Sequence, residues 1–395
     1  MNKAIAAWGL AAAIGCGPAL ARGDDKENPK PVETPYLKGS LGIQLRFDGT
    51  FAGDDDPGRR ALLYLDEGDA EFSLHPTDWL ALKAHVKGST VRGPAPRTSE
   101  AFRGFGVFME ELYVDLDFKH VAFFAGKFNP AFGLMHKADM VRGIFSRDFA
   151  LDYELTEKVG FGASLRGDAV EHGLGRHELT AALFFEDTTI LRCSLVTSPA
   201  FSEPLTTRAS TLSLGDGGVA NTETPNNAAI ALTGGGFGFA PDLEYHLGYR
   251  LQRASPAGLA AGTETADEHG VSVGFRHEFK IARLPGGTTV TPMVEWARLW
   301  NAGGNEGQLE YFSAAVAVAT GPWELWLSGS LRSAFASPAA ADIHDKVFSV
   351  SLDHQVTDWM KAGAGYRFRQ VADIGDHTIG IRLWFTHDFT LPLRR

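Results

Sequence analysis

Long stretches of this chain alternate between apolar and polar residues with a period of two. From Leu41 to Asp48, leucine, isoleucine and phenylalanine occupy the odd positions, and small or polar residues occupy the even ones. The same alternation recurs at residues 111–118, 158–166, 243–252, 271–280 and 361–369. Because successive side chains of a β-strand point to opposite faces, each such segment forms a strand with one apolar and one polar face. The sequence therefore predicts an all-β protein.

A soluble sandwich and a transmembrane barrel both produce this alternation, and three further features favour the barrel. The segments run to about ten residues or more, and a tilted strand needs about nine to eleven to cross a bilayer. Their polar faces are rich in ions and glycine, and the chain has 45 glycines among 395 residues. Tryptophans stand near segment ends, as in aromatic girdles: Trp79, Trp296, Trp300, Trp323, Trp359 and Trp384. Since lipid cannot hydrogen-bond an open sheet edge, we expect a closed transmembrane antiparallel β-barrel.

Short turns and long connections follow each other in alternation along the chain. Short turns are expected near residues 75–78, 117–120, 167–176, 240–242, 283–288, 320–322 and 356–358. Long connections are expected around residues 49–59, 88–104, 134–157, 187–228, 254–267, 300–307, 335–344 and 371–375. Outer-membrane barrels have short periplasmic turns and longer external loops, so this pattern predicts about sixteen strands, with both termini in the periplasm. Barrels with about two strands fewer or more are the alternatives.

Residues 1–21 have the layout of a secretory signal peptide. Lys3 supplies a positive charge, residues 4–20 are apolar and small, and Ala19-Leu20-Ala21 forms an A-x-A cleavage pattern. Residues 22–36 are polar and contain three prolines, which predicts a periplasmic tether. The barrel is then expected to occupy residues 37–395. We expect the protein in the outer membrane of a Gram-negative cell, surrounded by outer-membrane lipid.

Charge and motif content exclude several other functions. The 48 acids against 37 lysines and arginines give a net charge of -11, which argues against a nucleic-acid partner. The two cysteines lack zinc-site spacing, and the 13 histidines are scattered without an H-E-x-x-H motif. A barrel lipase needs a lipid-facing Ser/His pair, and no such pair is identified. We therefore expect no enzymatic activity, no cofactor and no metal site.

The inward positions of the predicted strands carry both signs of charge. The candidate pore-lining cations are Arg46, Lys83, Lys127, Arg166, Arg250, Arg276, Lys361, Arg367, Arg369 and Arg382. Fewer acids fall on inward positions, so a modest cationic bias is expected, and the surplus acids are assigned to loops and tether, for instance residues 54–56 and Asp66-Glu67. Charged rings set ion preference at a constriction, whereas charges that pair across strands only keep the lumen wet. Because Lys361, Arg367 and Arg369 share one inward face, they are the best single candidate for anion contact.

The run Gly126-Lys127-Phe128-Asn129-Pro130-Ala131-Phe132-Gly133-Leu134 closes the fifth predicted strand. It resembles the phosphate-selective porin O/P family, which has a similar Gly-Lys-Phe-x-x-Pro-Phe-Gly-Leu run before its third loop. A more diffuse resemblance extends through residues 152–160. The resemblance implies a sixteen-stranded homotrimeric porin whose third loop folds into the channel. It also implies that Lys127 is lumenal and that residues 136–157 form the constriction, with Lys137, Arg142 and Arg147 as candidate anion contacts.

The connection at residues 134–157 is long for a structureless loop, so we expect it to be functional or self-packed. Residues 140–149 could form a short helix with Ile144 and Phe149 packed against the wall. The alternative is a loop that covers the barrel mouth or a neighbouring subunit.

These observations predict an outer-membrane porin that gives passive diffusion of small hydrophilic solutes or ions. An anion or phosphate preference is a further expectation. The alternative is a structural or adhesive outer-membrane barrel whose lumen is closed or plugged. A plugged barrel is expected to contain a long insertion with many apolar residues, which form a core of their own.

Overall fold

The computed structural model describes residues 33–53, 60–91, 98–197, 210–283, 287–335 and 343–393. The predicted signal peptide and most of the predicted tether lie outside these residues.

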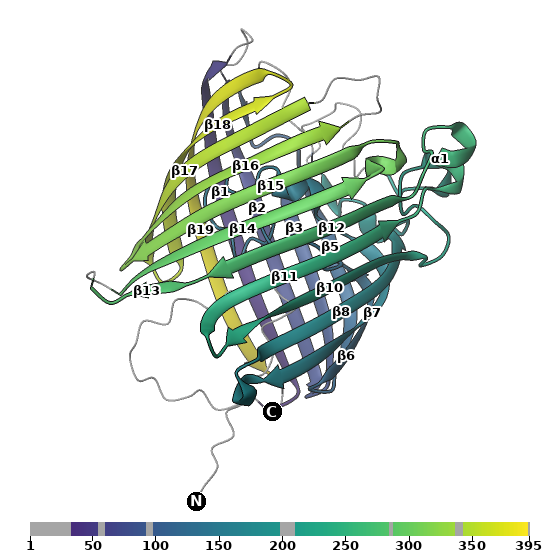
Figure 1. Ribbon diagram of the computed structural model, residues 1–395, viewed down its shortest axis with the longest axis horizontal. Coiled ribbons are helices and arrows are strands. Elements are labelled where there is room, and N and C mark those ends of the chain that lie inside the picture. Colours follow the sequence, from purple (N-terminus) through teal and green to yellow (C-terminus); the bar gives the residue numbers. More distant parts are fainter. Residues whose placement is uncertain are drawn as a thin grey trace, which may run out of the picture.

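In this part of the chain, sixteen long strands form one closed antiparallel barrel (Figure 1). They are β1 (Tyr36–Gly53), β2 (Arg60–Thr77), β3 (Leu80–Thr90), β5 (Phe105–Asp117), β6 (Val121–Phe128), β7 (Lys158–Ala169), β8 (Gly175–Glu186), β10 (Asn227–Phe237), β11 (Ala240–Gln252), β12 (Glu268–His277), β14 (Thr288–Trp300), β15 (Gln308–Thr320), β16 (Trp323–Phe335), β17 (Ile343–Thr357), β18 (Met360–Val371) and β19 (Ile374–Pro392). The last strand pairs with the first, from Tyr36 opposite Pro392 to Gly53 opposite Asp376. The prediction of a sixteen-stranded barrel is therefore confirmed.

Three short strands complete the sheet: β4 (Glu100–Ala101), β9 (Val196–Thr197) and β13 (Phe279–Ile281). The helical elements are α1 (Pro256–Ala261) and the 3-10 turns η1 (Ala150–Tyr153), η2 (Val170–His172), η3 (Ile190–Arg192), η4 (Leu214–Asp216) and η5 (Ala302–Gly304). Within the described ranges, none of the helices has the length and hydropathy of a membrane span.

The predicted helix at residues 140–149 is wrong. The chain makes successive turns there, and the 3-10 helix η1 follows at Ala150–Tyr153. Phe145 has a φ of 67°, a left-handed conformation that interrupts any right-handed helix at this point.

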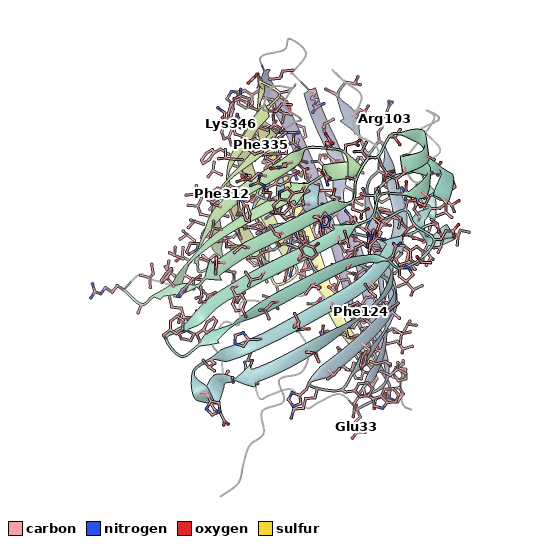
Figure 2. The ribbon with its side chains drawn as sticks, turned by 45° about the vertical axis from the view of Figure 1, so that its right-hand side comes forward. Glu33, Arg103, Phe124, Phe312, Phe335 and Lys346 are labelled. Carbon is pink, nitrogen blue, oxygen red and sulfur yellow. The ribbon has the colours of Figure 1, made fainter. Side chains whose placement is uncertain are left out.

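The period-two pattern separates an apolar outer face from a polar inner face. On β15, β16 and β17 the outward, exposed side chains are Phe312, Leu327, Leu331, Phe348 and Leu352. The inward, buried side chains of the same strands are Ser313, Ser328, Ser330, Ser349 and Ser351. Figure 2 shows Phe312 projecting from the outer surface of the wall. Such a broad exposed apolar surface is stable against lipid and not against water.

Aromatic side chains mark the end of the barrel that carries the short turns. Trp79, in the turn between β2 and β3, stacks on Phe118 with ring centroids 6.0 Å apart. Trp384 lies elsewhere: it lines the lumen, and the Lys361 Nζ is 5.8 Å from its ring centroid. The prediction of a girdle position for Trp384 is wrong, because its neighbour Leu383 points outward and the alternation turns Trp384 inward.

Two β-bulges bring pairs of consecutive acids to the lumen. The register between β1 and β2 shifts at Asp66, and that between β3 and β5 shifts at Glu110, so each residue is an extra one in its strand. A bulge re-aims side chains, and both Asp66 and Glu67, as well as both Glu110 and Glu111, line the lumen. The assignment of Asp66-Glu67 to a loop is therefore wrong. Residues 54–56, the other acids assigned to loops, lie outside the described part.

Candidate functional site: the charged lumen

Residues 129–157, which connect β6 to β7 and are called the β6–β7 segment below, are bonded to distant strands. The Gly133 amide donates to His246 Nε2 on β11 at 2.9 Å. The amides of Leu134 and Met135 donate to the two carboxylate oxygens of Glu295 on β14, at 2.6 and 2.7 Å. Further along, the Ile144 amide donates to Ser351 Oγ on β17 at 3.1 Å. These bonds hold the backbone of the segment against three strands.

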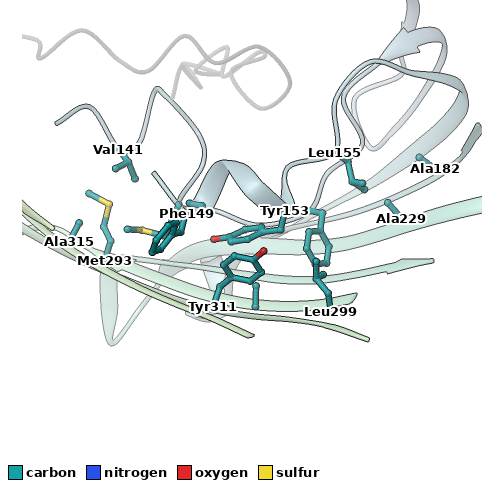
Figure 3. Close-up of a cluster of buried hydrophobic side chains, with 14 of the residues drawn as sticks. Val141, Phe149, Tyr153, Leu155, Ala182, Ala229, Met293, Leu299, Tyr311 and Ala315 are labelled. Atoms are coloured by element: carbon teal, nitrogen blue, oxygen red, sulfur yellow. The ribbon is translucent and has the colours of Figure 1, made fainter. Parts of the chain in front are cut away.

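A cluster of buried apolar side chains joins the segment to the barrel wall (Figure 3). The ring of Tyr153 lies 5.0 Å from that of Tyr311 on β15, and its hydroxyl donates to Glu295 at 2.6 Å. Val141 and Phe149 of the segment are buried in the same cluster. Several inward residues of β14 to β17 are small, among them the buried Ala297, Ala315, Ala317, Ser328 and Ser349. Small side chains leave room for the segment. Small residues at inward positions are therefore the sequence signal that could have indicated where the segment packs.

A cavity of about 1800 Å³ remains inside the barrel. One side of it is lined by β1, β2, β3 and β5, and another by the β6–β7 segment. It reaches the short turns at Gly321 and Asp358. Its lining carries charged residues from most of these elements, so the cavity is suited to water and polar solutes.

Nine of the ten predicted pore-lining cations form ion pairs with carboxylates of the described residues. The pairs are Arg46–Asp66 (2.9 Å), Lys83–Asp115 (2.6 Å), Lys127–Asp187 (2.7 Å), Arg166–Asp117 (2.9 Å), Arg250–Glu268 (2.7 Å), Arg276–Glu244 (2.8 Å), Lys361–Glu324 (3.0 Å), Arg367–Asp148 (2.9 Å) and Arg382–Asp353 (2.7 Å). Of the two interpretations of these charges, ion preference at a constriction and pairing across strands, pairing therefore applies to most of them.

Only half of these ten residues border the cavity: Arg46, Lys83, Arg166, Lys361 and Arg382. Lys361, Arg367 and Arg369, which were predicted to form one anion contact, have different surroundings in the structure. Lys361 faces the cavity, Arg367 reaches Asp148 of the β6–β7 segment, and Arg369 has an Nε without an acceptor in the described part of the chain.

All three predicted cations of the constriction loop line the cavity. Arg147 pairs with Glu67 of β2 at 2.7 Å. The Arg142 Nε donates to the carbonyl of Asp139 at 3.0 Å, and neither Arg142 nor Lys137 pairs with a described carboxylate. These two are therefore the cations of the segment whose charge is least compensated.

Sequence reasoning missed the acids that dominate the lining. The described residues around the cavity include fifteen Asp and Glu and nine Lys and Arg. Among the missed acids are Asp66, Glu67, Asp69, Glu71 and Glu110. A pair of adjacent acids within an alternating segment, as in Glu110-Glu111, is the signal that could have indicated a bulge.

Glu154 of the β6–β7 segment titrates near neutral pH. Burial, together with the charges of Glu110 and Glu67, raises its pKa to about 7 in spite of the nearby cations Lys87 and Arg147. The adjacent His136, 3.9 Å away, stays neutral because burial lowers its pKa well below the usual value. The charge of this carboxyl therefore changes within the physiological pH range.

No cluster of three or more His, Cys, Asp or Glu suited to a metal ion occurs among the residues for which the structure gives positions.

A closed sixteen-stranded antiparallel barrel with an apolar outer wall and a charged lumen is the architecture of an outer-membrane β-barrel protein. The outer membrane is accordingly the location of this chain, as predicted.

Comparisons with solved structures agree with this class. OprB of Pseudomonas putida has a TM-score of 0.53 at 9% identity, over 89% of this chain and 94% of that one. Outer-membrane-expressed OmpT of Vibrio cholerae has a TM-score of 0.51 at 12% identity, over 89% and 97%. OccK1 of Pseudomonas aeruginosa has a TM-score of 0.50 at 9% identity, over 89% and 99%. No protein-family model matches the sequence, and no curated protein matches it either.

Proposed function

We propose that this protein is an outer-membrane porin, a channel rather than an enzyme, through which small hydrophilic solutes diffuse passively. The observation that carries the proposal is the cavity of about 1800 Å³, which is lined by ionised side chains and extends to the short turns. The likeness to solved outer-membrane barrels supports the fold on which it stands. In this proposal residues 1–21 are removed on export, and residues 22–36 remain as a periplasmic tether.

The β6–β7 segment is proposed to narrow the channel. Its hydrogen bonds to β11, β14 and β17 and its share of the cavity lining support this role. The phosphate preference and the homotrimer rest only on the family resemblance, which is specific at residues 126–134 and more diffuse at residues 152–160. Contact with anions would fall to Lys137 and Arg142, because the other cations around the cavity have carboxylate partners.

A structural barrel with a plugged lumen is the second candidate. It is favoured by the apolar cluster that the β6–β7 segment forms with the wall, since a plug is expected to carry such a core.

Planar-bilayer recordings of the refolded mature chain decide between the two. The porin is expected to give stable open steps in KCl, whereas heat-denatured protein added at the same concentration gives none. Protein that is folded by circular dichroism and inserts into liposomes, but never conducts, would exclude the porin and favour the plugged barrel.

The titration of Glu154 is expected to make the current depend on pH. Because its pKa is raised to about 7, the carboxyl is neutral below this pH and negative above it. Ionised carboxylates at a constriction attract cations, so the permeability to K⁺ relative to Cl⁻ should rise as pH increases through about 7. Reversal potentials recorded at several pH values in a salt gradient measure this change. The Glu154→Gln variant is expected to reduce the step near neutrality, and a step of unchanged size would assign the titration to another group.

A further inference from the structure

We propose that the lumen favours small cations over anions, the opposite of the preference that the sequence suggested. This inference rests on the proposed porin function and concerns which solutes the channel takes. It follows from the acids that surround the cavity, from the ion pairs that compensate its cations, and from the place where the acids concentrate.

The charges around the cavity do not balance. Fifteen acids face nine lysines and arginines among the described lining residues. Seven of the nine cations form an ion pair with a carboxylate, and the two that do not are Lys137 and Arg142. Counting Asp, Glu, Lys and Arg alone, the lining acids exceed the lining cations by six. Arg276 and Arg367 lie outside the lining but pair with the lining acids Glu244 and Asp148, which reduces this surplus to four.

Six of the fifteen lining acids lie together on one part of the wall, called the acidic wall here. It consists of Asp66, Glu67, Asp69, Glu71, Glu110 and Glu111, which come from β2 and β5. The two strands are separated only by β3, which pairs with both. Because the bulges at Asp66 and Glu110 turn consecutive acids to the same side, this wall carries more carboxylates than regular strands could present.

Cations that share this region, together with His85, lie close to Asp66, Glu67, Asp69 and Glu110 of the acidic wall. Lys87 of β3 lies 3.3 Å from Glu110, and Arg147 of the β6–β7 segment lies 2.7 Å from Glu67. Arg46 of β1 pairs with Asp66, and His85 of β3 lies 2.8 Å from Asp69. Facing them from the segment is the further carboxyl of Glu154, which interacts electrostatically with Lys87, Glu110 and Glu67.

A cavity with low-dielectric walls focuses the field of such charges on the solute path. One carboxylate at about 4 Å from a cation contributes about 1 kcal/mol even in bulk water. That energy corresponds to about a fivefold change in local concentration. A surplus of carboxylates near the β6–β7 segment therefore raises the concentration of cations and lowers that of anions where the channel is proposed to be narrowest.

The test is the reversal potential of single channels of the full mature protein in a KCl gradient centred below about 0.1 M, where the Debye length is about 10 Å or more. We expect a permeability ratio of K⁺ to Cl⁻ of about fivefold, which falls as salt screens the wall. The double variant Asp66→Asn/Glu110→Gln removes both bulge acids and is expected to bring the ratio close to one. The matched control Glu171→Gln, an exposed acid of η2 outside the cavity lining, should leave the ratio unchanged.

A second double variant tests the inference independently, in case the first one does not fold. Lys137→Gln/Arg142→Gln removes the two cavity cations without a carboxylate partner and breaks no ion pair, so the ratio is expected to rise. Open channels that prefer Cl⁻, or whose ratio does not respond to either double variant, would overturn this inference and leave the porin function standing. A folded and inserted protein without current would overturn both.

Discussion

Glu295→Ala is expected to release the β6–β7 segment from the barrel wall and to increase single-channel conductance. The Glu295 carboxylate is 1% exposed and accepts three hydrogen bonds from the segment, from the amides of Leu134 and Met135 and from the hydroxyl of Tyr153. Alanine leaves three buried donors without an acceptor, at a cost of about 1–3 kcal/mol each. A loss of about 3 kcal/mol or more is large compared with the free energies that govern local opening of loops.

Two measurements check this expectation. Single-channel recordings should show larger and noisier steps, and limited proteolysis should cut the segment faster than in the unmodified protein. The control Glu295→Gln fills the same volume and keeps one acceptor oxygen, so an intermediate effect is expected. Conductance and protease resistance that equal those of the unmodified protein would show that Glu295 does not hold the segment.

Arg382→Ala is expected to destabilise the barrel by about 3–5 kcal/mol, because it leaves a buried carboxylate unpaired. Its partner Asp353 on β17 is 0% exposed. The guanidinium of Arg382 on β19 meets that carboxylate with two hydrogen bonds of 3.0 and 2.7 Å. The pair thus links β17 to β19 across β18, on the lumenal face of the sheet.

The free energy of unfolding, measured by urea titration in lipid vesicles with tryptophan fluorescence, gives the size of the loss. The variant Arg382→Gln/Asp353→Asn removes both charges and keeps polar groups in place, so it is expected to recover most of the stability. A double variant as unstable as Arg382→Ala would place the contribution of Arg382 in packing, for example against Trp384, whose ring centroid is 5.6 Å from its guanidinium carbon.

The candidate site was only partly predictable. Lys83, Arg46 and the three cations of the segment were expected to face the lumen, and the structure places them around the cavity. Their partners were not predictable, since Arg147 meets Glu67 across eighty positions of sequence. The acidic wall was missed because each bulge adds one residue to its strand, so that the residues beyond it change faces. An alternating sequence pattern does not show where such a change occurs.

The sequence by itself determined the class of fold, the strands and their approximate number. These follow from local rules, because alternation assigns each side chain to one face, and turn residues end each strand wherever they occur. The tertiary structure decided where residues 129–157 pack, which charges compensate one another, and that Trp384 lies in the lumen. Those outcomes depend on which strands meet after the barrel closes, and closure brings together residues whose separation along the chain carries no information about their contact.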